Sequence, residues 1–165
     1  MHLLLSTIKT PLGVLNLLAD QHVLIGANFS SVDDLYLPLG SDDRLREIKS
    51  VKTVPVITEL LQGYFDGDIR AINSITVRQS GAAFSQSAWK AMRKVAPGKT
   101  LSYADLAARS GSPAAVRAAG SACAKNAIVL VVPCHRIVKT GGALGNYAYG
   151  LDKKEWLLNH EGALL

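Results

Sequence analysis

The stretch AIVLVVPCHRIVKTGG, residues 127–142, holds the sharpest contrast in this sequence. Six apolar residues and a proline lead directly into Cys134, His135 and Arg136. Polar groups are costly to bury without partners, so three of them at the end of an apolar run need a reason. A cysteine thiolate is a strong nucleophile, and a nearby histidine raises its ionised fraction. The stretch therefore predicts either a nucleophile site or an ordinary buried cysteine.

Strand geometry limits direct contact between Cys134 and His135. Neighbouring side chains of a strand point to opposite faces, so contact needs an irregular turn or a bridging water. A third group should hold the other imidazole nitrogen. The candidates are Glu155 and Glu161, in the closing segment LDKKEWLLNHEGALL.

The composition is that of a globular protein with a basic excess. The 165 residues are 48% hydrophobic and 19% charged, and 18 Lys and Arg against 13 Asp and Glu give a net charge of +5. This charge permits a nucleic-acid partner without requiring one. It predicts that any binding to DNA is weak, salt-sensitive and largely independent of sequence.

The cysteines and the apolar runs set expectations about metals and location. Cys123 and Cys134 lack the spacing of metal ligands, so we expect no metal site. The opening MHLLLSTIKT has too short an apolar run for a secretion signal, and no run approaches the roughly 20 residues of a membrane span. We expect no membrane association and a cytoplasmic protein, or a nuclear one in a eukaryote.

The first half of the sequence has the turn signals and apolar patterns of a mixed α/β domain. Gly81 follows it as a break, so we predict two domains, 1–78 and 79–165. The predicted elements of the first are strands over 2–30 with turns at 11–13 and 20–22, loop and a short helix over 31–53, a helix over 54–65 with Pro55 in its first turn, and a strand over 71–79.

The second half is predicted to be mainly helical. Its first helix ends at Ala96-Pro97-Gly98, and its apolar face is formed by Phe84, Ala88, Ala91, Met92 and Val95. Ser102 is predicted to cap a helix over 103–109, with Asp105 as its capping-box partner. After a turn of about three residues, Ser112 is predicted to cap a third helix with Pro113 at its first position.

The third helix, PAAVRAAGSACAK, consists almost entirely of small residues. Arg117 is the one long side chain in its middle. Composition favours close helix packing, with Cys123 as a small packing residue. The alternative is a helix-turn-helix whose smooth helix enters a DNA groove.

The motif Pro133-Cys134-His135-Arg136-Ile137 resembles the active-site motif of the O(6)-alkylguanine-DNA alkyltransferases. The similarity is close over roughly 84–162 and diffuse over 1–80. Further matches at the family's spacing are Phe84 and Trp89, Ser102-Tyr103, Ala115-Val116-Arg117-Ala118, Asn126, Gly145-Asn146-Tyr147, Gly150, Lys154-Glu155-Trp156-Leu157-Leu158 and His160-Glu161-Gly162.

The resemblance implies a two-domain α/β fold. An RNase H-like N-terminal domain is followed by a mainly helical C-terminal domain that carries a helix-turn-helix and the active site. It also implies suicide DNA repair without a cofactor: an alkyl group moves irreversibly from the O6 of guanine, or less readily the O4 of thymine, to the protein's own cysteine. The expected partner is double-stranded DNA carrying O6-alkylguanine, bound through the minor groove by a monomer.

The resemblance assigns a role to each matching residue. Cys134 is the alkyl acceptor, His135 its base through a water, and Glu161 the holder of the imidazole. Asn126 braces the turn, and Tyr103 donates a proton to the departing purine.

Further roles concern the DNA and the base that leaves the duplex. Arg117 fills the gap in the stack. Arg136 is interpreted as a salt-bridge residue that fixes the turn. The remaining expected DNA contacts are Ala118, Ser102 and Tyr103, and the expected pocket residues are Tyr147, Ala148, Tyr149, Ile137 and Pro133.

Three rival functions stay open. A non-repairing relative would bind alkylated bases and flag the damage, but such proteins lack the acceptor cysteine. A helix-turn-helix regulator would read one DNA sequence through base edges, for which Arg117 alone offers little. A Cys-His hydrolase would turn over repeatedly and need no DNA.

Overall fold

The computed structural model describes residues 1–163, which form two compact units. The first comprises residues 1–80 together with 127–131, and the second comprises 81–126 together with the segment from Val132 onward. Within the described residues, no helix combines the length and the apolar character needed to cross a membrane.

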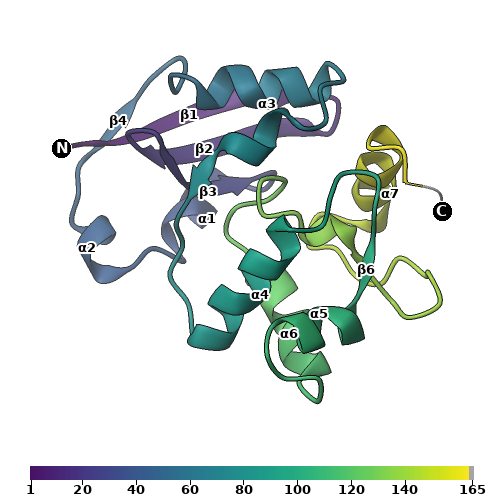
Figure 1. Ribbon diagram of the computed structural model, residues 1–165. Coiled ribbons are helices and arrows are strands. Elements are labelled where there is room, and N and C mark those ends of the chain that lie inside the picture. Colours follow the sequence, from purple (N-terminus) through teal and green to yellow (C-terminus); the bar gives the residue numbers. More distant parts are fainter. Residues whose placement is uncertain (164–165) are drawn as a thin grey trace. The chain divides into compact units, whose positions relative to one another are not determined.

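A five-stranded mixed sheet forms the centre of the first unit (Figure 1). Three strands make an antiparallel meander, as predicted for residues 2–30: β1 (Leu3–Thr10), β2 (Gly13–Asp20) and β3 (Val23–Asn28). Two short strands extend it in parallel, β4 (Ile48–Ser50) beside β1 and β5 (Thr76–Val77) beside β3.

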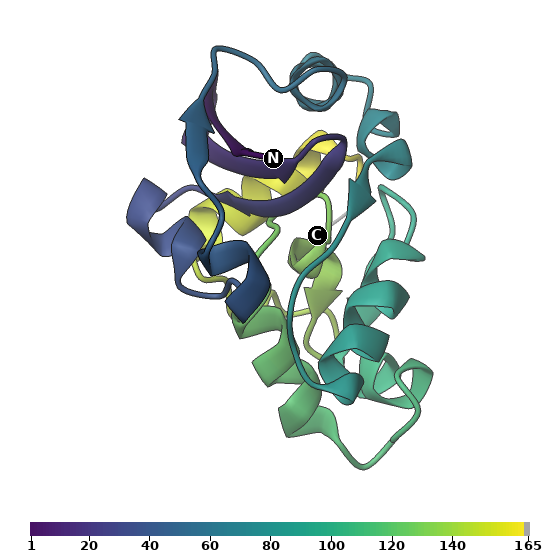
Figure 2. The ribbon, with the colours of Figure 1, turned by 90° about the vertical axis from the view of Figure 1, so that its left-hand side faces the viewer.

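Helices cover both faces of this sheet. Figure 2 shows α3 (Ile57–Phe65) on one side of the strands and α1 (Val32–Tyr36) on the other. The central strand β2 is accordingly buried without interruption from Leu15 to Ala19, instead of alternating. One core cluster consists of Leu3, Leu18, Ile25 and Leu35.

Three predictions for the first unit need correction. Residues 31–53 form two short helices, α1 and α2 (Ser41–Arg44), and the strand β4. The helix predicted from residue 54 begins only at Ile57, because Val56 has a φ of +69°. The strand predicted over 71–79 is a 3-10 helix over Ala71–Ser74 followed by β5, because turn-forming Asn and Ser residues end that helix.

The apolar run ahead of Cys134 is core of the first unit. Ala27 of β3 donates its N–H to the carbonyl of Ala127 at 2.9 Å and accepts from Val129 at 3.0 Å. The chain then turns at Leu130, whose φ of +73° is unfavourable for a residue with a Cβ. Leu130 is fully buried, so packing holds this conformation. The run is therefore a buried turn, and the strand geometry assumed for Cys134 and His135 does not apply.

The second unit is built on helices. The predicted apolar face of α4 (Ala83–Arg93) is confirmed for Ala88, Ala91 and Met92, whereas Phe84 is only half-buried. Val95 is buried too, but it lies just beyond the end of the helix. Trp89 is buried as well, and its indole N–H is satisfied because it donates to the carbonyl of Ala122 at 2.9 Å. The helices of this unit are α4 (Ala83–Arg93), α5 (Tyr103–Arg109), α6 (Val116–Ala124) and α7 (Leu151–His160).

The start of α5 is confirmed. The hydroxyl of Ser102 accepts from the N–H of Asp105 at 3.0 Å, and the helix spans the predicted residues 103–109. This cap satisfies one of the free N–H groups of the first turn.

The start of α6 was predicted wrongly. The helix begins at Val116, and its cap position, Ala115, makes no side-chain hydrogen bond. Ser112 closes a turn instead, accepting from the N–H of Ala115 through its carbonyl at 2.9 Å. Pro113 lies in this turn, so residues 110–115 connect the two helices and the connection is longer than three residues.

Candidate active site

A short irregular segment presents the cysteine. Cys134 is the first residue of a 3-10 helix, η2 (Cys134–Arg136), which leads into β7 (Ile137–Val138). β7 pairs in parallel with β6 (Leu101–Ser102), the strand directly before α5. This small sheet ties the cysteine turn to the start of the helix that carries Tyr103.

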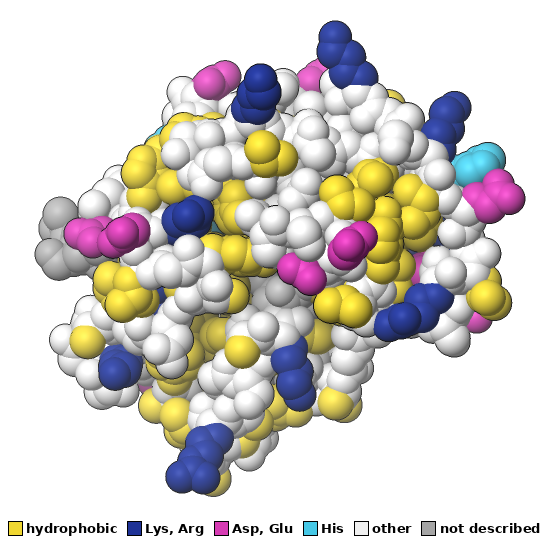
Figure 3. All heavy atoms as spheres, turned by 180° about the vertical axis from the view of Figure 1, so that it is seen from behind, with side chains coloured by type: hydrophobic (Ala, Val, Ile, Leu, Met, Phe, Trp, Pro, Cys, Tyr) yellow, Lys and Arg dark blue, Asp and Glu magenta, His cyan; other side chains and the backbone are white. Residues whose placement is uncertain are grey.

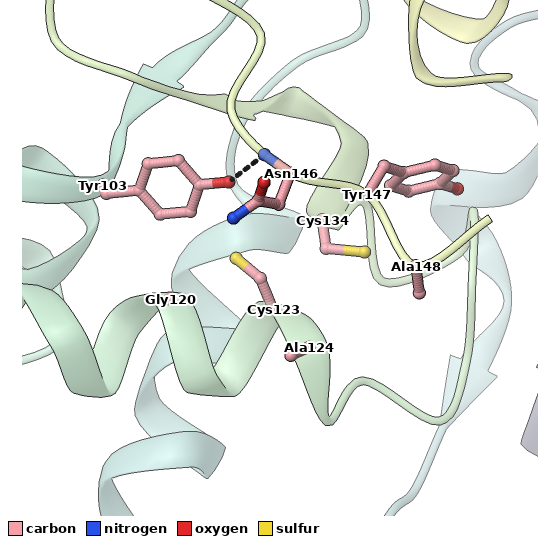
Figure 4. A pocket seen from close by; sticks show the side chains of 8 residues that line it. All are labelled: Tyr103, Gly120, Cys123, Ala124, Cys134, Asn146, Tyr147 and Ala148. Atoms are coloured by element: carbon pink, nitrogen blue, oxygen red, sulfur yellow. Dashed lines mark hydrogen bonds between the residues drawn. The ribbon is translucent and has the colours of Figure 1, made fainter. Parts of the chain in front are cut away.

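Cys134 lies at a cavity of about 280 Å³ within the second unit (Figure 4). The cysteine is 8% exposed, and it is one of the residues that line this cavity. The volume suits a ligand no larger than a small drug. The lining residues are Tyr103, Gly120, Cys123, Ala124, Cys134, Asn146, Tyr147 and Ala148.

Asn126 braces the segment before the cysteine. Its side-chain amide donates to the carbonyl of Val132 at 2.8 Å and to the sulfur of Cys134 at 3.4 Å. The two bonds join the end of α6 to both sides of Pro133. The asparagine therefore fixes the position of the thiol as well as the path of the backbone.

The thiol of Cys134 is protonated at rest. Burial raises its pKa, and the hydrogen bond from Asn126 and the charge of Lys154 only partly oppose this. Burial likewise raises the pKa of Cys123, to about 12. A reaction at Cys134 therefore requires a base that removes the proton.

A buried trio stands beside the cysteine. The Nε2 of His135 lies 2.8 Å from Oε2 of Glu161. Arg136 donates to both oxygens of the same carboxylate at 2.8 and 2.9 Å, and to the carbonyl of Val95 at 2.7 Å. The predicted salt bridge of Arg136 is confirmed. Burial alone would raise the pKa of Glu161, but His135 and Arg136 outweigh it and hold that pKa well below its usual range.

The trio determines which imidazole nitrogen can act as a base. The ionised carboxylate of Glu161 only accepts hydrogen bonds, so the Nε2 of His135 carries the proton. Burial lowers the pKa of His135 more than Glu161 raises it, so the ring is neutral. Its Nδ1 therefore holds a lone pair, and this buried atom has no hydrogen-bond partner within residues 1–163.

Tyr103 and the loop before α7 close another side of the cavity. The phenol oxygen of Tyr103 accepts from the N–H of Asn146 at 3.4 Å. Burial raises the pKa of Tyr103, so its hydroxyl keeps its proton. Gly145 has a φ of +77°, and a Cβ there would lie 2.8 Å from the phenol oxygen. Glycine thus permits both the turn and the close approach of the ring.

Comparisons with known proteins agree on one family. Residues 83–163 match the model of the 6-O-methylguanine DNA methyltransferase DNA-binding domain. A methylated-DNA–protein-cysteine methyltransferase of Shigella flexneri is 34% identical over 169 residues, covering 100% of this chain and 99% of that protein. The chain belongs to this methyltransferase family.

Other family members extend the comparison. The match to a Salmonella typhimurium relative is 41% identical and covers 66% of this chain but only 64% of the relative's length. A crystal structure of Mycobacterium tuberculosis OGT in complex with DNA superposes with a TM-score of 0.80 at 29% identity, covering 96% of this chain and 92% of that one. The mixed α/β fold is thus shared with the family.

The structure separates the predicted family residues into three groups. Cys134, Tyr103, Tyr147 and Ala148 line the cavity, with Asn126, His135 and Glu161 bonded as described. Glu155, the other candidate for holding the imidazole, is exposed on α7. Three of the predicted pocket residues are not among the residues that line the cavity: Pro133, Ile137 and Tyr149. Of the predicted DNA contacts, Ser102 caps α5, and Arg117 and Ala118 lie in the first turn of α6.

Several residues that line this cavity were not predicted from the sequence. Gly120, Cys123 and Ala124 are spaced i, i+3 and i+4, so α6 presents one small-residue face to the cavity. That spacing was the available signal. Lys154 was also not predicted as a site residue. The available signal was its spacing: Leu157 and Leu158 follow it by three and four residues, which places all three on the buried face of α7.

We also looked for side chains that could bind a metal ion. The part of the chain from residue 1 to 163 contains no group of three or more His, Cys, Asp or Glu side chains that could hold a metal ion.

Proposed function

We propose that this protein repairs DNA by moving an alkyl group irreversibly from the O6 of guanine, or less readily the O4 of thymine, to its own Cys134. The observation that carries the proposal is the buried Cys134, which lines a cavity, accepts a hydrogen bond from Asn126 and directly precedes the His135–Glu161 pair. The matching names of relatives over the full chain support the same reaction.

The proton of the thiol leaves before or as the sulfur attacks. In this proposal a water passes it from Cys134 to Nδ1 of His135, the nitrogen that holds the lone pair. Glu161 keeps the other nitrogen protonated and stabilises the imidazolium that forms. The sulfur then bonds to the alkyl carbon while the carbon–O6 bond breaks, and its electron pair stays on the guanine.

Tyr103 is proposed to neutralise the leaving guanine. Its hydroxyl is protonated at neutral pH and lines the same cavity as Cys134. Donation of that proton to N3 of the purine lets the base leave as a neutral molecule, which is general acid catalysis. No cofactor enters the balance, and the protein is consumed because the thioether on Cys134 does not revert.

The damaged base has to leave the duplex to reach the cavity. We infer that α5 and α6 act as a helix-turn-helix with α6 in the minor groove, since Arg117 and Ala118 are exposed at its start. On the face shown in Figure 3, lysine and arginine side chains stand apart from one another. The net charge of +5 supports an attraction to DNA that is weak, salt-sensitive and largely independent of sequence.

The finer fold and partner assignments belong to the same proposal. The antiparallel meander with helices on both faces supports an RNase H-like first unit, and the helices of the second support a DNA-binding and active-site domain. We propose that the protein acts as a monomer on duplex DNA, with Tyr149 and the backbone around Ala148 near the bound base.

Intact-protein mass spectrometry tests the proposal. After incubation with a duplex containing O6-methylguanine, the protein should gain one methyl group and stop at one per molecule. Cys134→Ala should gain none. A mass gain in both proteins, or repeated turnover, would contradict transfer to Cys134.

The main alternative is a relative that binds alkylated bases without repairing them. The buried, braced Cys134 argues against it, because a binder needs no acceptor thiol. In the same experiment this alternative gives a retained oligonucleotide with no change in protein mass.

Gly145→Ala is expected to slow methyl transfer about tenfold, because the new Cβ would push the Tyr103 ring from its position. Gly142→Ala is the matched control, since Gly142 also has a positive φ, +96°, but open space around its Cβ position. Both variants share the cost of a left-handed alanine, so their difference reports on Tyr103. Single-turnover rates measure it, and equal rates would show that the ring tolerates the contact.

Arg117→Ala is expected to slow transfer from duplex DNA about tenfold, because the side chain no longer fills the gap left by an extruded base. Transfer from the free base O6-methylguanine should be unchanged. Arg109→Ala, which removes another exposed arginine at the end of α5, controls for the lost charge. Equal loss in both variants would assign the effect to charge instead of base extrusion.

A further inference from the structure

Lys154 is the buried charged group that the steps above leave without a role. It lies in α7, and its side chain is 0% exposed. A buried ammonium is costly unless it is paired and hydrogen-bonded. A buried position therefore requires hydrogen-bond acceptors for the ammonium group of Lys154.

The partners of Lys154 belong to two sides of the cavity. Its Nζ donates to the carbonyl of Ile137 at 2.6 Å and to the carbonyl of Asn146 at 3.0 Å. Ile137 directly follows the cysteine turn, and Asn146 lines the cavity from the loop before α7. One ammonium thus holds together the segment that presents the thiol and the loop that covers it.

The same contacts reach Tyr103. The Nζ of Lys154 lies 5.8 Å from the centroid of the Tyr103 ring, within the range of a cation–π interaction. The N–H of Asn146 donates to the phenol oxygen, while its carbonyl accepts from Lys154. Displacing the ammonium would therefore free the loop residue that orients the phenol.

The charge of Lys154 affects the pKa of both thiols that line the cavity. Burial lowers the pKa of Lys154, while Cys134 and Cys123 oppose this; in return the lysine lowers the pKa of each thiol. The other titratable groups near this set are the phenol of Tyr103 and the trio of His135, Arg136 and Glu161. The trio is paired internally, so the charge of Lys154 is the one on this side of the cavity that favours the ionised form of Cys134 without being part of an ion pair among the described residues.

We propose that Lys154 is a positioning residue of the transfer site, which clamps the Ile137 and Asn146 carbonyls and stabilises the thiolate of Cys134 as it forms. This inference rests on the proposed function for its role in transfer, whereas the clamp on the two carbonyls stands on the hydrogen bonds of Lys154 alone.

The test compares neutral and charged replacements. Lys154→Met and Lys154→Gln remove the charge, Lys154→Arg keeps it, and Lys153→Met is the control on the neighbouring, partly exposed lysine. The first readout is the pH dependence of Cys134 modification by iodoacetamide, located by peptide mass mapping. The second is the single-turnover rate with a duplex containing O6-methylguanine, beside the affinity for that duplex.

In the neutral variants the pH midpoint of Cys134 modification should rise, and transfer at pH 7 should slow at least about tenfold. The reason is that each unit of rise in the thiol pKa lowers the thiolate fraction at pH 7 about tenfold. Lys154→Arg should keep the midpoint near that of the unaltered protein, and DNA affinity should not change. A folded neutral variant that behaves like Lys153→Met would overturn the proposal, as would an arginine variant displaced as far as the neutral ones.

The failure of the two proposals can be told apart. If the unaltered protein gains no methyl group but its thiol midpoint still moves in the neutral variants, the transfer function fails and the role of Lys154 toward the thiol stands. If transfer occurs and the midpoint does not move, only the role of Lys154 fails.

Discussion

Glu161→Gln is expected to lower the free energy of unfolding by about 3 kcal/mol, because it leaves the buried guanidinium of Arg136 without its countercharge. Transfer should fall by at least about a hundredfold, since the amide no longer stabilises an imidazolium at His135. Urea denaturation and single-turnover kinetics measure the two effects. Glu155→Gln, exposed on α7, is the matched control and should change neither.

The stability effect has a defined pH dependence. The pKa of Glu161 is held below its usual range, so the carboxylate stabilises the fold fully above the ordinary glutamate pKa of about 4.3. That contribution is lost as the pH falls toward the lowered value. The stability difference between the unaltered protein and Glu161→Gln should therefore be constant near pH 7 and shrink in acid. A difference that grows in acid would contradict an ionised Glu161.

His135→Gln is expected to slow transfer at pH 7 by about a hundredfold to ten-thousandfold, the range for loss of a general base. Burial raises the pKa of Cys134, so without His135 little thiolate forms near neutrality. The remaining rate should therefore climb with pH as the thiol ionises unaided. Rates of methyl transfer measured across a pH series give both results.

The control for this variant is another histidine. His160→Gln changes a ring at the end of α7 that stacks on Trp156 with centroids 4.7 Å apart. Its transfer rate should stay within about twofold of the unaltered protein. A His135→Gln protein with an unchanged rate at pH 7 would remove His135 from the proton path.

Local chemistry explains why much of the fold was predictable. The strands over 2–30 alternate with turn residues, and Ser102 with Asp105 marks the start of α5, so short-range patterns were sufficient there. The motif around Cys134 likewise indicates the family from the sequence alone. Each of these features is decided by residues close together in the chain.

The errors arose where distant residues decide the local structure. Leu130 adopts a positive φ because packing buries it completely, which no local propensity indicates. Pro113 was predicted to be the first residue of a helix. It lies instead in a turn that is closed by the hydrogen bond between the N–H of Ala115 and the carbonyl of Ser112. Of the strand predicted over 71–79, only the two residues of β5 are strand, because only they pair with β3.

The sequence by itself determined the family and singled out Cys134 and the residues near it as the candidate site, since motif and spacing are properties of the chain. Only the tertiary structure decided between Glu155 and Glu161, assigned the free lone pair to Nδ1 of His135, and brought Lys154 to two carbonyls of the cavity wall. The physical reason is that burial and hydrogen-bond partners fix charge and tautomer, and both come from segments far apart in sequence.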